Sequence, residues 1–204
     1  MSYVLVFAPL IGFLLTICFG KLLGDRISQT LTSSLVLVST LISFFYFFKF
    51  ISNDTAIIND KIINWLSSGK LNFDWSIYID PLTSLMLVVI TSISFLVHIY
   101  SIEYMSHDKS KPRFMAYLSF FTFAMIMLVT ADNFVQLFFG WEGVGLCSYL
   151  LIGFWCSKES ANTAALKAFL VNRVGDLGLI LGIAAIFMVF GTIEFANVFR
   201  LAPE

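Results

Sequence analysis

The sequence contains a series of apolar stretches, each long enough to cross a lipid bilayer. About 18 or more largely apolar residues in a row mark a membrane-spanning helix. Of the 204 residues, 59% are hydrophobic and only 12% are charged, which is about half the charged fraction usual in soluble proteins. We therefore predict an all-α, polytopic transmembrane helix bundle with six spans, at 3–23, 30–51, 81–103, 114–131, 133–156 and 164–190.

The one sizeable polar segment lies between the second and third predicted spans. Its last part, FDWSIYID (73–80), alternates apolar and polar side chains, which is the period of a short β-strand. Residues 56–66 could pair with it as a hairpin or could form a short amphipathic helix, and the pattern leaves both open. Asp80 and Pro81 then mark a helix start, because Asp caps free N–H groups and proline needs no donor there. The expected organisation is two N-terminal spans (1–52), an extramembrane loop (53–80) and four further spans (81–204).

Basic residues in the short loops predict how the chain is oriented, because such loops face the cytoplasm or the mitochondrial matrix. These residues are Lys21, Arg26, Lys109, Lys111, Arg113 and Lys158. The opposite side carries Lys49, Lys61, Lys70 and Arg200, diluted by acids. We therefore expect both ends of the chain to lie on the side away from the basic loops.

Several function classes lack support in the sequence. The net charge of −1 gives no indication of a nucleic-acid partner, and no G-x-G-x-x-G or Walker A motif occurs. Cys18, Cys147 and Cys156 fall in apolar stretches, at spacings that suit neither a zinc site, an iron–sulfur cluster nor a disulfide framework. We expect them to be small apolar residues in the bundle. We also expect no metal, NADH or redox cofactor on this chain.

Four charged residues fall inside predicted spans, at least three residues from either end: Glu142, Lys167, Arg173 and Asp176. Glu142 lies about 4–5 Å from the mid-plane of its span, Asp176 about 3 Å and Arg173 about 6 Å, at the rise of an α-helix. An ionised side chain at such a depth costs about 2.5–3.5 kcal/mol and usually marks an ion or proton path. A carboxyl group that can be either charged or neutral is the basic requirement of a proton relay.

Each of these residues also has a structural interpretation. Arg173 and Asp176 are three residues apart, so they share a helix face and could pair simply to hold the bundle together. Lys167 lies near a membrane surface, where a lysine can extend to water, and it lies on the face opposite Asp176. Glu142 has no opposite charge within its own span, so its partner must be another helix or a proton. The proton-path interpretation is therefore favoured most at Glu142.

Small residues and one histidine complete the candidate set. Gly140, Gly143 and Gly145 flank Glu142, while Gly175, Gly178 and Gly182 form a stripe on the last span, and small residues let helices approach closely. His98 lies near the basic end of its span, close to Tyr100 and Glu103. A histidine in that setting predicts an anchor at the membrane interface, with a titrating role as the alternative.

Three long motifs resemble the large antiporter-like subunit of respiratory complex I, called subunit L in bacteria and subunit 5 in mitochondria. They are IDPLTSLMLVVITSISFLVHIYSIEYMSHD, FFGWEGVGLCSYLLIGFW and ALKAFLVNRVGDLGLILG, in the order of that family. The likeness runs from about Asp80 to Gly191, and PLIGF near the N-terminus agrees with the first helix of the family.

The resemblance implies a proton-translocating, non-redox subunit of NADH:quinone oxidoreductase. NADH, FMN, iron–sulfur clusters and quinone would then be held by partner subunits, and the partners in the membrane would include antiporter-like paralogues. In the family, the acid of the WEG motif is a proton-path residue, which falls on Glu142. The RVGD pair falls on Arg173 and Asp176, and the lysine of KAF falls on Lys167. A bacterial inner membrane is expected more than a mitochondrial one.

The sequence departs from the family in one respect, because family members continue for many more spans. The broken helix that carries a lysine partner for the WEG acid follows the region matched here. The expectation is therefore an N-terminal fragment or a truncated copy. The alternative functions are a subunit of a multisubunit sodium/proton antiporter, or an inactive truncated paralogue with a structural role.

Overall fold

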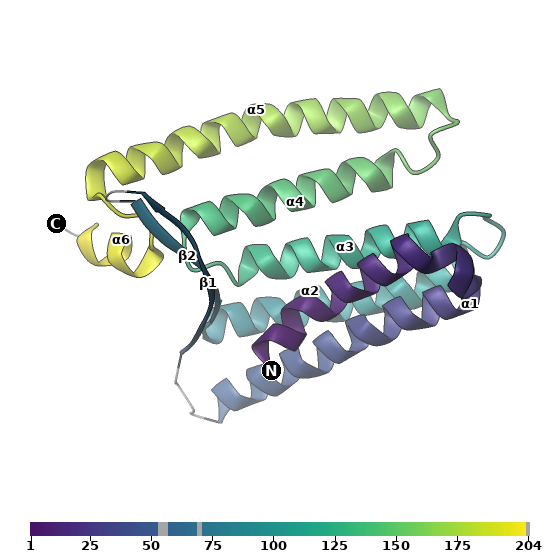
Figure 1. The fold of residues 1–204 in the computed structure, drawn as a ribbon, viewed down its shortest axis with the longest axis horizontal. Helices are drawn as coiled ribbons and strands as arrows, with labels where there is room; N and C mark the ends of the chain where they lie inside the picture. Colours follow the sequence, from purple (N-terminus) through teal and green to yellow (C-terminus); the bar gives the residue numbers. More distant parts are fainter. Residues whose placement is uncertain (53–56, 69–70, 203–204) are drawn as a thin grey trace.

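A computed structural model describes residues 1–52, 57–68 and 71–202, and it confirms an all-α bundle with one small hairpin. Within the described residues, five helices are long and apolar enough to cross a membrane. Their bounds are α1 Ser2–Ile51, α2 Pro81–Tyr104, α3 Lys111–Val129, α4 Phe134–Ile152 and α5 Glu159–Phe190. The short helix α6 (Phe195–Leu201) and the strands β1 (Ile58–Ser68) and β2 (Leu71–Ile79) lie at one end of the bundle (Figure 1).

Helix α1 supplies the first two predicted spans because it folds back on itself at Gly24. That residue has φ 77° and ψ 170°, a region that essentially only glycine adopts. The two arms pack together, and the Ser39 hydroxyl donates to the Leu5 carbonyl at 2.9 Å. Five long helices therefore give the six helical crossings that the sequence predicts.

Helices α1, α2 and α3 form one cluster, α4 packs on α3, and α5 packs on α4 at the outside (Figure 1). The bend of α1 and the α2–α3 and α4–α5 loops lie at one end of this bundle, which we call the basic end. Met1, the hairpin and α6 lie at the other end. This arrangement confirms that the short basic loops share one side and that both ends of the described chain lie opposite them.

The segment before α2 is a hairpin, which decides between the two predicted alternatives. Strand β1 pairs antiparallel with β2, with Ile58 opposite Ile79 and Lys61 opposite Ser76. Residue 56, at the start of the predicted partner segment, lies outside the described residues. Ile77 and Ile79 are fully buried against α1, α2 and α3, so the hairpin caps the apolar core of the bundle.

The helix ends follow local signals. The Asp80 carboxylate accepts from the Thr83 backbone N–H at 2.6 Å, which confirms the predicted cap and the start at Pro81. Helix α4 ends at Ile152, four residues before the predicted end. The reason is packing, because Phe154 is buried in the loop, with its ring centroid 5.1 Å from that of Phe114.

Candidate functional site

Glu142 and Arg173 form the centre of the candidate site and come from neighbouring helices. The Arg173 Nη1 atom donates to Glu142 Oε1 at 2.6 Å, between α5 and α4. The Glu142 side chain is 24% exposed and the Arg173 side chain 50% exposed, counting only this chain. Of the two partners predicted for Glu142, another helix or a proton, the structure shows a partner on another helix.

Asp176 lies beside this pair and is more deeply buried. Its Oδ2 atom is 3.9 Å from Arg173 Nη1, which confirms the predicted contact across three residues, and its side chain is only 7% exposed. The Trp141 indole N–H donates to Asp176 Oδ1 at 2.9 Å. The Arg173 guanidinium also lies 4.9 Å from the centre of the Phe169 ring. One guanidinium therefore faces two carboxylates and also contacts an aromatic ring.

The pair borders a cavity of about 330 Å³ between α3, α4 and α5, which we call the central cavity. Glu142 and Arg173 are the charged residues of its lining, and the other walls include Phe120, Phe139 and Leu146. In such apolar surroundings an unpaired carboxylate is costly. Arg173 supplies the positive charge that stabilises the Glu142 carboxylate at this cavity wall.

Two glycines fix α4 against α3 at this depth. A Cβ atom at Gly140 would lie 2.6 Å from Leu128 Cα, and one at Gly143 would lie 3.2 Å from Ala124 Cβ. The predicted close approach of helices is confirmed at these two positions. At Gly145, and along the α5 stripe of Gly175, Gly178 and Gly182, the prediction is wrong within the described chain, because nothing lies within 4 Å of an added Cβ.

Lys167 does not join the cluster. Its side chain is exposed, and it makes no hydrogen bond or ion pair with any residue that the structure describes.

The cysteines are only partly as predicted, since Cys147 is buried, whereas Cys18 and Cys156 are exposed. No group of three or more histidine, cysteine or acidic side chains among the described residues is arranged to hold a metal ion.

The interfacial role predicted for His98 is wrong, because the ring is fully buried between α2 and α3. Its Nδ1 atom is 2.8 Å from the Ser94 carbonyl, which can only accept, so Nδ1 carries the proton. Its Nε2 atom then accepts from the Ser119 hydroxyl at 3.3 Å. The sequence feature that indicates this buried position is a polar stripe at helical spacing. It places Thr91, Ser94, His98 and Ser101 on one face of α2.

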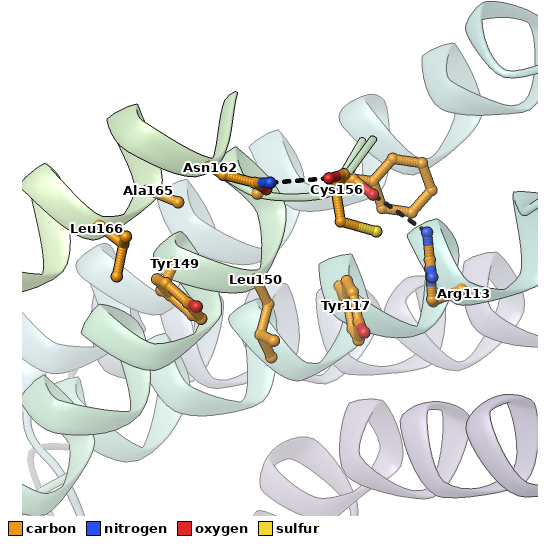
Figure 2. Close-up of a pocket in the computed structure, with 10 residues that line it drawn as sticks. Arg113, Tyr117, Tyr149, Leu150, Cys156, Asn162, Ala165 and Leu166 are labelled. Carbon is orange, nitrogen blue, oxygen red and sulfur yellow. Dashed lines mark hydrogen bonds between the residues drawn. The ribbon is translucent and has the colours of Figure 1, made fainter. Parts of the chain in front are cut away.

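A second cavity, of about 420 Å³, lies between α3, α4 and α5 at the basic end (Figure 2). We call it the basic-end cavity. Its lining includes the phenol rings of Tyr117 and Tyr149. Two hydrogen bonds bracket its outer end: Asn162 Nδ2 to the Cys156 carbonyl at 2.8 Å, and Arg113 Nη2 to the Phe154 carbonyl at 3.1 Å.

The fold and the site define a polytopic helical membrane protein that holds a carboxylate–guanidinium cluster between two of its spans. Two family profiles match the sequence. Residues 65–115 match the N-terminus of chain 5 of NADH-ubiquinone oxidoreductase (complex I). Residues 131–203 match the transmembrane family of NADH:quinone oxidoreductase and Mrp antiporters.

Curated relatives agree with these matches. The chain is 49% identical to NADH-ubiquinone oxidoreductase chain 5 of Chondrus crispus, over all of this chain and 30% of that protein. It is 47% identical to NADH-quinone oxidoreductase subunit L of Rickettsia bellii, over all of this chain and 32% of that protein. The chain belongs to the family of antiporter-like membrane subunits that includes complex I chain 5 and subunit L, and it spans about 30% of the length of these relatives.

Solved structures with low sequence identity share the fold. A chain of the archaeal membrane-bound sulfane sulfur reductase superposes with a TM-score of 0.80 at 19% identity, over 98% of this chain and 40% of that one. A chain of the Mrp complex from Dietzia superposes with a TM-score of 0.75 at 22% identity, over 95% of this chain and 20% of that one. The helix arrangement is thus shared by different multisubunit membrane complexes.

Proposed function

We propose that this chain is the N-terminal part of a proton-translocating membrane subunit of NADH:quinone oxidoreductase, and that Glu142 carries the proton. The observation that supports this most is the Glu142–Arg173 pair, placed on the wall of an apolar cavity at membrane depth. The chain contributes coupling and no redox chemistry. NADH, FMN, iron–sulfur clusters and quinone are held by other subunits, and its partners are membrane subunits of the same complex.

The charge arrangement gives the relay two states. With Arg173 at 2.6 Å, the carboxylate of Glu142 is stabilised as an anion. When the arginine turns toward Asp176, now 3.9 Å away, Glu142 is left in the central cavity and is stabilised by taking a proton. When Arg173 turns back to Glu142, release of the proton from Glu142 is favoured. Trp141 holds Asp176 by its indole N–H, so that Asp176 is ready to receive the guanidinium.

The route to Glu142 follows the seam between α4 and α5. Consecutive turns of α4 line the central cavity through Leu146 and the basic-end cavity through Tyr149. On α5, Phe169 borders the central cavity, and its ring centre lies 5.5 Å from that of Tyr149. This aromatic pair separates the two cavities. Protons would enter from the basic end and pass it when the two rings part.

The sodium/proton exchanger remains the less supported alternative. The curated relatives at 46–49% identity are subunits of NADH-quinone or NADH-ubiquinone oxidoreductases. The likeness to the Mrp complex structure, at 22% identity, concerns the fold alone. The proposed location is an energy-converting membrane, and we favour the bacterial inner membrane over the mitochondrial one.

The test places this chain in a working complex. In subunit L of Rhodobacter capsulatus, which is 46% identical over 211 aligned residues, the matching segment is replaced by this chain. Proton uptake driven by NADH is then measured in inverted membrane vesicles. We expect Glu142→Gln to lower the protons taken up per NADH oxidised, with the complex still assembled, because glutamine cannot carry the proton.

Glu159→Gln is the matched control. Glu159 lies in the first turn of α5, is exposed and lines none of the cavities described above, so it should leave the proton yield unchanged. A Glu142→Gln complex that pumps as the unsubstituted chimera does would exclude Glu142 as the carrier. Sodium uptake in place of proton uptake would favour the exchanger.

A further inference from the structure

A third cavity, of about 390 Å³, lies at the basic end between the bend of α1 and the start of α3. We call it the α1–α3 cavity. Its polar lining consists of Thr16, Lys21, Asp25, Lys109, Ser110 and Arg113. Glu142, Arg173 and Asp176 do not contribute to it, so the proton relay leaves this site unexplained.

Buried polar atoms without partners are concentrated here. Among the described residues, six buried side-chain nitrogen or oxygen atoms have no hydrogen-bond partner. Two of the six, Thr16 Oγ1 and Arg113 Nε, belong to residues that line the cavity. A third is Ser28 Oγ, which is 3.8 Å from the position of a Cβ built at Gly20, another lining residue. Such atoms are rare in native proteins, and all three can donate.

The charge of the cavity is positive. Lys21, Lys109 and Arg113 line it, and its one lining acid, Asp25, is engaged by Lys111 at 3.3 Å. Helix α3 also begins here, and the side chain of its first flanking residue, Ser110, makes no capping hydrogen bond. In that first turn Pro112 has no N–H, so the N–H groups of Lys111 and Arg113 supply the partial positive charge of the helix start, which the Asp108 carboxylate offsets in part by accepting from the Ser110 N–H at 2.7 Å.

We propose that the α1–α3 cavity binds a phosphate group, and that in the membrane this is the phosphodiester of an anionic phospholipid. A phosphate supplies several acceptor oxygens for the unpartnered donors, among them Thr16, which is only 2% exposed. Basic pockets between helices at a membrane surface are suited to anionic headgroups. Ile17 lines the cavity and is exposed, as is Leu14 one turn below, so an acyl chain can lie along α1.

The test counts lipids retained by the whole chain. The chain is extracted in a mild detergent with equal amounts of phosphatidylglycerol and phosphatidylcholine, and bound lipids are measured by native mass spectrometry. We expect preferential retention of phosphatidylglycerol. The double variant Lys21→Gln/Lys109→Gln should weaken it on the order of twentyfold, at about fivefold for each cation near a membrane surface. Phosphatidylcholine binding should not change.

Two further variants distinguish a specific binding site in the cavity from a nonspecific effect of positive surface charge. Thr16→Val keeps the shape of the side chain and removes only the hydroxyl, and should weaken phosphatidylglycerol retention about tenfold, as the loss of a hydrogen bond to a charged group does. The matched control, Arg26→Gln/Lys158→Gln, removes the same charge from the same end, at residues that do not line the cavity. It should change retention less than twofold.

The results for these variants decide whether the α1–α3 cavity is a specific phosphate site. Equal losses in the two double variants, or full retention in Lys21→Gln/Lys109→Gln, would overturn the site. Addition of millimolar inorganic phosphate shows whether the cavity binds the free anion or the phosphodiester of a lipid. If it displaces phosphatidylglycerol, the cavity takes the free anion and the lipid assignment is wrong; if the lipid persists, the assignment stands.

Discussion

Replacing Gly140 with alanine tests whether the close contact of α3 and α4 positions the site. The new Cβ would lie 2.6 Å from Leu128 Cα and 2.7 Å from Leu128 N. These are backbone atoms, so no side-chain rotation relieves the clash. Reaching an ordinary contact of 3.4 Å from 2.6 Å requires the two helices to part locally by about 0.8 Å.

The expected cost follows from two opposing effects. Overpacking of this kind destabilises by about 1–3 kcal/mol, whereas alanine favours a helix over glycine by about 1 kcal/mol. Gly145→Ala, five residues further along α4, gains only the second effect, because nothing lies within 4 Å of its added Cβ. The two variants should therefore differ by about 1–3 kcal/mol, or about 2–12 °C in Tm for a chain of this length.

Thermal unfolding in detergent can be followed at Cys147, which is fully buried on α4. A thiol-reactive fluorophore reports its exposure, once the exposed Cys18 and Cys156 are changed to serine. Gly140→Ala should react at a lower temperature than Gly145→Ala. Equal unfolding temperatures for the two variants would refute the argument that this contact sets the spacing of α3 and α4.

Three other predictions concern the ends of the bundle. Gly24→Ala should cost about 1–3 kcal/mol because φ 77°, ψ 170° is strained for any other residue, and an unchanged Tm would contradict this. Gln136 is fully buried and accepts from the Ser76 N–H at 3.2 Å while donating to its carbonyl at 2.7 Å. Gln136→Met should cost about 2–4 kcal/mol and speed deuterium exchange of the Ser76 amide, and equal exchange would count against it. Hydrogen bonds from the Trp155 indole and the Ser110 N–H lower the pKa of Asp108 from its ordinary 3.8. Its stabilising contribution is therefore present above pH 3.8 and is lost as the pH falls through the lowered pKa. Asp108→Asn should therefore reduce the fall in Tm as the pH drops below 3.8, and parallel curves for the two proteins there would show that Asp108 contributes nothing.

Much of the fold could be predicted from the sequence, because apolar runs of membrane length admit few alternatives to helices. The pairing of Asp80 with Pro81 located the start of α2 to the residue. The sequence did not decide between a hairpin strand and a helix for residues 56–66, because the segment before FDWSIYID has no strict alternation of apolar and polar residues. Its strands are held by contacts distant in sequence, such as Gln136 with Ser76, which no local pattern reveals.

The candidate site was predictable only in its charged members. Glu142, Arg173 and Asp176 are conspicuous because a charge inside a span is costly, and the structure brings all three together. The role of Trp141 could not be predicted, because a tryptophan in an apolar span gives no indication of its hydrogen-bond partner. His98 was placed at the interface because its position near a helix end was weighed above the polar stripe that it shares with Thr91 and Ser101.

A proton carrier at position 142 must be able to hold a proton within the membrane, and infrared spectroscopy tests this directly. The whole chain in lipid bilayers is stepped through pH, and the C=O stretch of protonated carboxyl groups is followed. We predict a band that grows as the pH falls, that is absent in Glu142→Gln and that persists in Glu159→Gln. Carboxyl C=O bands in Glu142→Gln identical to those of the unsubstituted chain at every pH would show that Glu142 takes up no proton.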